Sequence, residues 1–187
     1  MNPVEALAAI AILASVWLTV RRSLWLWPVG IAGTLLYGWV FLNAKLYFSS
    51  GLQAFFLVVQ VYGWWFWATR SGGREPPIVS MGWAKAAGVL ALTGAVAGGL
   101  GWGVGFFSDA KASLFDGSLT GLSIVAQALL SRKVLENWLF WIVTDVISIG
   151  VYGSQGLYVT AALYALLLCM ACWGLWTWLR ADREATR

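Results

Sequence analysis

The segment Leu46–Trp67, LYFSSGLQAFFLVVQVYGWWFW, recurs 111 residues later as Leu157–Trp178, LYVTAALYALLLCMACWGLWTW. The same offset extends backward without a gap to Arg21-Arg22, which aligns with Arg132-Lys133. Matched residues in the two copies include Trp27 with Trp138, Leu52 with Leu163, Gly63 with Gly174, Trp65 with Trp176 and Trp67 with Trp178. A match that holds at one fixed offset is typical of an internal repeat.

The chain that carries this repeat has the composition of a membrane protein. Of its 187 residues, 60% are hydrophobic and 11% are charged, and the mean hydropathy is +0.76. A helix needs about 20 mostly apolar residues to cross a bilayer, so we expect about seven crossings and no further soluble domain. Apolar runs bounded by charged or turn residues predict the spans 4–20, 24–43, 46–68, 83–106, 114–130, 134–153 and 157–179.

The repeat predicts how these helices are grouped. Because the offset spans four helices, the two copies have the same orientation in the membrane. We therefore predict an all-α membrane protein of seven transmembrane helices, in which a linker helix joins two parallel three-helix bundles. The predicted units are 1–68 for the first repeat, 69–113 for a cytoplasmic loop and the linker helix, 114–180 for the second repeat and 181–187 for a cytoplasmic tail.

The basic residues predict the orientation of the chain. With seven crossings the loops alternate between the two sides, and only Lys45 and Lys111 fall on the side of the N-terminus. The other ten are Arg21, Arg22, Arg70, Arg74, Lys85, Arg132, Lys133, Arg180, Arg183 and Arg187. Loops rich in Lys and Arg face the cytoplasm, so we predict a cytoplasmic C-terminus and an external N-terminus. This bias explains the net charge of +4, and we expect the lipid bilayer rather than nucleic acid as a partner.

The residue types argue against an enzyme. The chain has no histidine, and its two cysteines, Cys169 and Cys172, lie in an apolar run. This removes the usual zinc sites and any catalytic triad that needs imidazole, so we expect no metal, no cofactor and no catalytic residue. A seven-helix retinal receptor is also excluded, because the span 157–179 has no lysine for a Schiff base.

The sixth predicted helix carries the best candidate for a binding site. Trp138, Trp141 and Asp145 are spaced i, i+3, i+7, which places two indoles and one carboxyl group on one helical face. An ionisable group at membrane depth costs about 2.5–3.5 kcal/mol and marks a functional site by default. Indoles attract cations and stack on flat rings, so this face suits an aromatic cation. The alternative is a protonated Asp145 that bonds to another helix, with the tryptophans in packing roles.

Four other polar residues are candidates for the same site. Gln53 and Gln60 are spaced i, i+7 on the third predicted helix, and Tyr164 occupies the repeat position of Gln53. Such side chains can bind the hydroxyls or ring nitrogens of a ligand, or bond between helices. Asn137 is a further candidate that could equally cap the sixth helix.

The two copies differ at the candidate site. Thr34 has the repeat position of Asp145, and Gly30 has that of Trp141. We therefore expect the ligand-binding groups to be concentrated in the second copy.

The sequence resembles the PnuC-type vitamin transporter family along nearly its whole length. The matching motifs are Leu46-Tyr47 with Leu52-Gln53, Tyr62-Gly63-Trp64, Arg132-Lys133, Glu136-Asn137-Trp138-Leu139-Phe140-Trp141, Gly156-Leu157-Tyr158 and Leu163-Tyr164. The resemblance implies a fold similar to the sugar-transporting SWEET proteins and a place in the bacterial inner membrane. It also implies that the segment from Asn137 to Asp145 recognises the substrate.

The function implied by this resemblance is vitamin uptake by facilitated diffusion, with a cytoplasmic kinase that traps the product by phosphorylation. We expect nicotinamide riboside as the substrate and thiamine as the close alternative, since both carry a cationic aromatic ring. The resemblance also suggests a homotrimer. An alternative of another class is the substrate-capture subunit of an ATP-driven uptake complex, which co-purification with an ATPase would favour.

Overall fold

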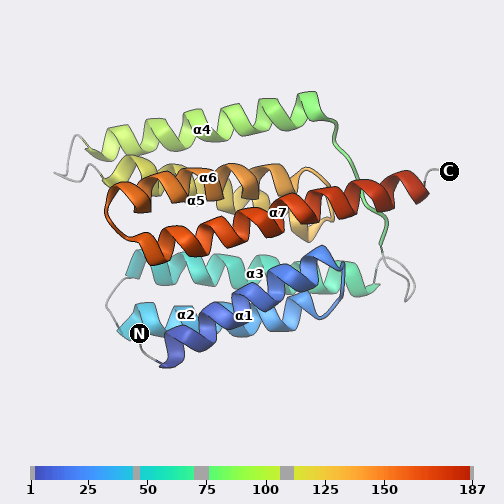
Figure 1. The fold of residues 1–187 in the computed structure, drawn as a ribbon, viewed down its shortest axis with the longest axis horizontal. Coiled ribbons are helices and arrows are strands. Elements are labelled where there is room, and N and C mark those ends of the chain that lie inside the picture. Colours follow the sequence, from blue (N-terminus) through green and yellow to red (C-terminus); the bar gives the residue numbers. More distant parts are fainter. Residues whose placement is uncertain (1–2, 44–46, 70–75, 106–111, 186–187) are drawn as a thin grey trace.

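The computed structural model describes residues 3–43, 47–69, 76–105 and 112–185, and in these ranges the chain forms seven α-helices (Figure 1). They are α1 (Pro3–Val20), α2 (Leu26–Asn43), α3 (Tyr47–Thr69), α4 (Trp83–Gly105), α5 (Ala112–Ser131), α6 (Asn137–Ser154) and α7 (Tyr158–Ala185). The predicted all-helical fold is confirmed, and most predicted boundaries agree within a few residues. The largest differences are a later start of α6 and a longer α7.

Three helices end in the same backbone motif. Arg22, Lys133 and Gly156 have positive φ angles of 55°, 57° and 75° just after α1, α5 and α6. After α1, Arg22 N–H donates to Thr19 O at 2.9 Å and Ser23 N–H donates to Leu18 O at 3.0 Å. This pair of bonds is the Schellman motif, which satisfies the last carbonyl groups of a helix. The motif recurs after α5 at the repeat positions, so the α1–α2 and α5–α6 turns have the same geometry.

The helices pack as two groups that meet at two contacts (Figure 1). In one group α2 packs against α1 and α3, and in the other α6 packs against α5 and α7 while α4 lies along α5. The groups meet where α3 packs against α5 and where α1 packs against α7. The predicted repeat relates these two contacts, because α3 corresponds to α7 and α5 corresponds to α1. The division into two bundles and a linker stays a prediction.

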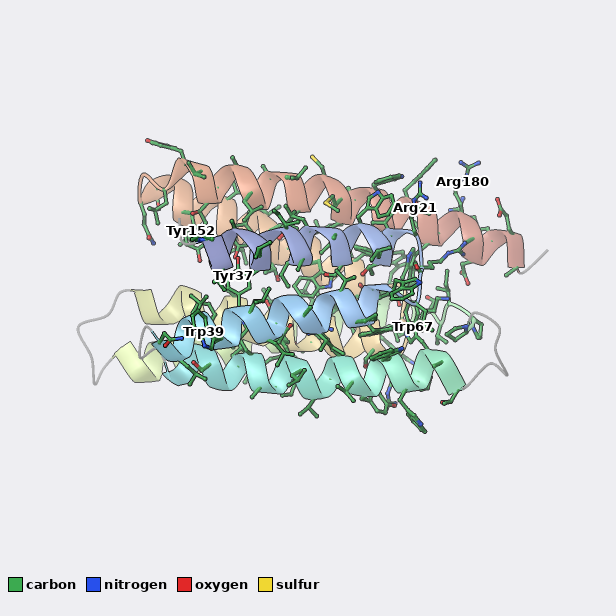
Figure 2. The ribbon with its side chains drawn as sticks, turned by 90° about the horizontal axis from the view of Figure 1, so that it is seen from below. Arg21, Tyr37, Trp39, Trp67, Tyr152 and Arg180 are labelled. Atoms are coloured by element: carbon green, nitrogen blue, oxygen red, sulfur yellow. The ribbon has the colours of Figure 1, made fainter. Side chains whose placement is uncertain are left out.

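The basic residues that the structure describes lie toward one end of the helices. Figure 2 shows Arg21 and Arg180 at this end, and Tyr37, Trp39 and Tyr152 toward the opposite end. We refer to the end with Arg21 and Arg180 as the basic end. Five other basic residues used for the predicted orientation lie outside the described residues, and they are Lys45, Arg70, Arg74, Lys111 and Arg187.

Two helices, α2 and α7, have the length and composition of membrane spans on their own within the described residues. In α3, α5 and α6, polar residues such as Gln60, Gln127 and Asp145 interrupt the apolar runs. These three side chains are buried inside the protein. A helix can cross a bilayer with such residues when they face other helices instead of lipid. Seven crossings therefore stay a prediction.

Residues 76–79, which precede α4, are hydrogen-bonded to the turn between α5 and α6. Val79 N–H donates to Lys133 O at 3.1 Å, and Leu135 N–H donates to Val79 O at 2.8 Å. The buried ammonium of Lys133 donates to Pro76 O at 2.6 Å and lies 4.7 Å from the centre of the Trp67 ring. These contacts hold residues 76–79 against the second group of helices.

Glu136 caps the start of α4 from across this turn. Its buried carboxylate accepts hydrogen bonds from Met81 N–H at 3.1 Å, from Gly82 N–H at 3.0 Å and from the Ser80 hydroxyl at 2.5 Å. Met81 and Gly82 directly precede α4, and a negative charge near the N-terminus of a helix is favourable. Glu136 therefore links the start of α4 to the start of α6.

Replacing Glu136 by alanine is expected to destabilise the protein. The variant Glu136→Ala leaves partly buried N–H groups without their acceptor, which should lower the free energy of unfolding by about 1–3 kcal/mol. Thermal unfolding of the detergent-solubilised protein measures this as a lower Tm. The control is Glu184→Ala, because Glu184 is exposed near the end of α7. If the two variants have the same Tm, the cap does not contribute to stability.

Candidate functional site

A cavity of about 320 Å³ lies between the two groups of helices. Side chains from α1, α2, α3, α5, α6 and α7 line it, and no described residue of α4 is among them. Small-molecule sites usually measure about 300–1,000 Å³ and combine apolar walls with a few polar groups. The cavity is therefore large enough for one small organic molecule.

The predicted face of α6 borders this cavity. Trp138, Trp141 and Asp145 all line it, and Thr144 lies beside them. The Thr144 hydroxyl donates to Phe140 O at 2.8 Å, so its proton is engaged within the helix. Asp145 is 4% exposed, and its carboxyl group has no hydrogen bond or ion pair with any described residue. The structure thus brings two indoles and one unpartnered carboxyl group to the same wall.

The opposite wall is polar and neutral. Gln60 from α3 donates through Nε2 to the Thr34 hydroxyl of α2 at 2.6 Å, and both residues are buried. Gln53 lines the same wall farther from the basic end, and Gly30 lines it nearer that end. A ligand in the cavity would therefore meet a carboxyl group on one side and an amide–hydroxyl pair on the other.

Tyrosines lie toward the end of the cavity that is distant from the basic end. Tyr164 of α7 lines the cavity and stacks on Tyr152 of α6, with the ring centres 5.4 Å apart and the planes 12° apart. Tyr37 of α2 also lines the cavity, and Figure 2 shows Tyr37 and Tyr152 toward the same end of the protein. Phenol rings thus narrow the cavity there.

Four tryptophans form a ring cluster at the end of the cavity nearer the basic end, and one of them, Trp138, lines the cavity. The ring centres are 5.5 Å apart for Trp27 and Trp67, 6.2 Å for Trp67 and Trp178, and 5.6 Å for Trp178 and Trp138. All four side chains are almost fully buried, and they belong to one hydrophobic cluster with Leu26 and Leu130 of the cavity lining. We refer to these four tryptophans as the tryptophan floor.

Two indoles of the tryptophan floor pack directly against glycines of neighbouring helices. A Cβ atom at Gly174 would lie 2.5 Å from the Trp138 ring, and one at Gly63 would overlap the Trp27 ring even more closely. Trp178 Nε1 donates to Thr19 O at 3.1 Å. The other three indole N–H groups, of Trp27, Trp67 and Trp138, have no hydrogen-bond partner among the described residues. Packing rather than hydrogen bonding therefore holds this cluster together.

Asn137 lies outside the cavity lining. It is fully buried at the start of α6, where its Nδ2 donates to Val134 O at 2.7 Å. Its Oδ1 has no partner among the described residues. Asn137 sits one residue before Trp138, on the basic side of the tryptophan floor. A direct role for Asn137 in ligand binding stays a prediction that this position does not favour.

Several lining residues were missed by sequence reasoning. They are polar side chains on α1, α2 and α5, and they include Ser15, Thr19, Thr34, Tyr37, Ser123 and Gln127. Ser123 and Gln127 have i, i+4 spacing, which places them on one face of the otherwise apolar end of α5. This spacing is a signal that could have identified α5 as part of the wall. Ser15 and Thr19 have the same spacing, but their hydroxyls bond to backbone carbonyls of α1.

This arrangement defines a class of protein. Apolar helices that surround a partly polar cavity, with an unpartnered carboxyl group inside it, are typical of a membrane carrier for a small molecule. Residues 2–180 match the nicotinamide mononucleotide transporter family, and the chain belongs to this family.

Individual relatives agree with this assignment. The chain is 26% identical to the nicotinamide riboside transporter PnuC of Escherichia coli, in an alignment that covers 97% of this chain and 87% of that protein. It is 30% identical to the riboflavin/roseoflavin transporter RibM of Streptomyces davaonensis over 173 residues, which cover 88% and 79% of the two chains. The crystal structure of the vitamin B3 transporter PnuC matches the fold with a TM-score of 0.73 and 20% identity, over 98% of this chain and 84% of that one.

These findings confirm the predicted family and the coarse function. The protein is a multi-pass inner-membrane transporter for a small vitamin-type molecule, and it is not an enzyme.

We expect the close packing of Trp138 against Gly174 to be essential for the tryptophan floor. The variant Gly174→Ala places a methyl group in the Trp138 ring, and such overpacking should lower the free energy of unfolding by about 1–3 kcal/mol. The control is Gly150→Ala on α6, because a Cβ at Gly150 meets no atom within 4 Å. A thermal scan should show a lower Tm only for Gly174→Ala. A wild-type Tm for this variant would contradict the described packing.

Proposed function

We propose that the protein carries nicotinamide riboside across the inner membrane by facilitated diffusion. The observation that carries this proposal is the Asp145 carboxyl group, which lines the cavity beside two indoles and has no hydrogen bond or ion pair with a described residue. Nicotinamide riboside has a flat cationic pyridinium ring and a sugar with several hydroxyls. The ring fits the carboxyl–indole wall, because cations over indole faces gain about 0.5–2 kcal/mol and the carboxylate supplies the counter-charge.

The neutral wall suits the rest of this ligand. Hydroxyl and amide groups of the substrate can bond to Gln53, Gln60 and Tyr164, which line the cavity at membrane depth. A polar ligand group that leaves water needs such partners, since an unsatisfied buried group costs about 1–3 kcal/mol. Charge recognition on α6 and hydrogen bonding on α3 and α7 would together select a cationic riboside.

The proposed orientation assigns the two ends of the cavity to the two sides of the membrane. The bias of basic residues supports a cytoplasmic C-terminus and an external N-terminus, with seven crossings arranged as two bundles around a linker. A ligand would then enter past Tyr37 and Tyr164 and leave past the tryptophan floor. Since indoles pack across this exit, the floor must open during each transport cycle.

Facilitated diffusion alone does not concentrate the substrate. Asp145 is the one acidic side chain lining the described cavity, and a single carboxyl group makes a poor relay for coupled proton transport. Net uptake then requires that the product be removed inside the cell. We propose that a cytoplasmic kinase phosphorylates it, because the added negative charge prevents its return. The suggested homotrimer stays a prediction.

Thiamine and flavins are the competing substrates. Thiamine also carries a cationic aromatic ring, so the carboxyl–indole wall does not discriminate against it. The similarity to RibM raises the possibility of a flavin, as that relative is named a riboflavin/roseoflavin transporter. The neutral isoalloxazine ring of a flavin would leave Asp145 without a counter-charge in a low-dielectric site, which is unfavourable. The site therefore favours the cationic ligands.

Uptake into liposomes tests the proposed function. Purified protein in liposomes should let labelled nicotinamide riboside equilibrate in the absence of ATP and of any ion gradient. Excess unlabelled nicotinamide riboside should slow the initial uptake of the label, and riboflavin should not. Protein-free liposomes are the control. Uptake no faster than this control would contradict the substrate assignment, and accumulation above the external concentration would contradict simple diffusion.

Trapping is tested with the same vesicles. Liposomes loaded with a nicotinamide riboside kinase and ATP should accumulate the label, whereas liposomes loaded with ATP alone should only equilibrate. Equal final amounts in both preparations would contradict the trapping step.

A further inference from the structure

The two walls of the cavity differ most at one pair of repeat-related positions. On α6 the indole of Trp141 lines the cavity, and at the equivalent place on α2 Gly30 has no side chain. Both residues border the same cavity, so the first group of helices has space where the second group has a ring. The next repeat-related pair is Asp145 on α6 and Thr34 on α2.

The amide of Gln60 occupies the space above Gly30. A Cβ atom at Gly30 would lie 2.5 Å from Gln60 Oε1, and its next contact would be Ser15 Cβ at 3.5 Å. A carbon and an oxygen that are not bonded pack at about 3.5 Å or more, so any residue larger than glycine would displace this amide. The second contact is an ordinary van der Waals distance. The close approach of Gln60 is therefore the specific reason why position 30 excludes a side chain.

The displaced amide would lose its bond to Thr34. Gln60 Nε2 donates to Thr34 Oγ1 at 2.6 Å, one turn along α2 from Gly30. With Nε2 engaged, Gln60 Oε1 has no hydrogen-bond partner among the described residues, and Gln60 lines the cavity. The bond to Thr34 thus fixes the orientation of the Gln60 amide, with its carbonyl oxygen beside Gly30, in the lining of the cavity. At the repeat position of Gln60 the second group of helices has Ala171, so the arrangement occurs in the first group alone.

We propose that Gly30 is a positioning residue that determines specificity. By leaving space on α2, it lets Gln60 bond to Thr34 and present Oε1 to the ligand. The wall then selects a ligand that carries a hydrogen-bond donor, a hydroxyl or an amide N–H, away from the part that Asp145 neutralises. This proposal rests on the proposed function, because it assumes that the cavity binds nicotinamide riboside.

A double-mutant cycle tests the positioning role. The variants are Gly30→Ala, Gln60→Ala and the combination of both, and the measurement is the Kd of nicotinamide riboside in detergent by isothermal titration calorimetry. We expect Gly30→Ala and Gln60→Ala each to weaken binding about tenfold, the effect of one lost hydrogen bond in a desolvated site. The double variant should bind within about twofold of Gln60→Ala, because Gly30 acts only through Gln60.

Two more variants separate positioning from a general packing defect. Gly38→Ala on the same helix is the control, because its Cβ would make an ordinary contact of 3.6 Å with Gln53 Cβ, and its Kd should equal that of the wild type. Thr34→Val removes the hydroxyl that holds Gln60 without adding bulk at position 30, and it should weaken binding as Gly30→Ala does. Thr34→Val keeps the test decisive if Gly30→Ala fails to fold.

Specificity supplies the second measurement. The Kd is compared between wild type and Gly30→Ala for ribosyl-pyridinium, which lacks the ring carboxamide, and for three deoxyribose analogues, each of which lacks one of the three ribose hydroxyls. Loss of the donor that bonds to Oε1 should make one of these four ligands insensitive to Gly30→Ala. If all four ligands lose affinity as the parent ligand does, the variant has damaged the site generally and the specificity role is wrong.

The outcomes separate this proposal from the proposed function. If the wild-type protein binds no nicotinamide riboside, the proposed function fails and the positioning role falls with it. If the wild type binds but Gly30→Ala has the wild-type Kd, only the positioning role is wrong. It is also wrong if Gly30→Ala weakens binding equally with and without Gln60, because Gly30 would then act through another neighbour.

Discussion

The rest of the structure depends on one constraint, the close packing of Trp27 against Gly63 and of Trp138 against Gly174. Each indole lies where any side chain on the facing helix would collide with it, so α2 approaches α3 and α6 approaches α7 closely. Edge-to-face contacts join Trp27 to Trp67 and Trp138 to Trp178, and a tilted contact joins Trp67 to Trp178. Aromatic pairs contribute about 0.5–1.5 kcal/mol each beyond their buried area. The resulting tryptophan floor connects the two groups of helices and borders the cavity through Trp138.

Above this floor the two groups of helices line one cavity with different chemistry. The second group contributes a ring and a carboxyl group through Trp141 and Asp145, whereas the first contributes an amide and a hydroxyl through Gln60 and Thr34. A cavity with two equivalent walls would bind a symmetric ligand or a ligand in two orientations. The difference at these positions gives the cavity a charged side and a neutral side. A carrier of this kind can hold a molecule that is itself cationic at one end and hydroxylated at the other.

The sequence predicted the parts of the molecule that depend on local periodicity. Apolar runs set the helix positions, and the i, i+3, i+7 spacing placed Trp138, Trp141 and Asp145 together, as the cavity lining shows. Contacts between distant residues could not be predicted in this way. Glu136 caps α4 from a position more than fifty residues away, and Gln60 reaches Thr34 only because Gly30 leaves room. Asn137 shares the motif of its neighbour Trp138 but points away from the cavity lining, since adjacent helical residues face different directions.

The central claim is that Asp145 binds the positive charge of the transported molecule, and paired ligands that differ in that charge test it most directly. Nicotinamide riboside and its reduced dihydro form have nearly the same shape, but only the former has a cationic ring. The measurement is the Kd of both ligands for the wild type and for Asp145→Asn, which keeps the size of the side chain and removes its charge. We expect the variant to bind the cationic form at least about tenfold more weakly and the neutral form within about twofold of the wild type. Equal losses for both ligands, or no loss for either, would contradict the claim.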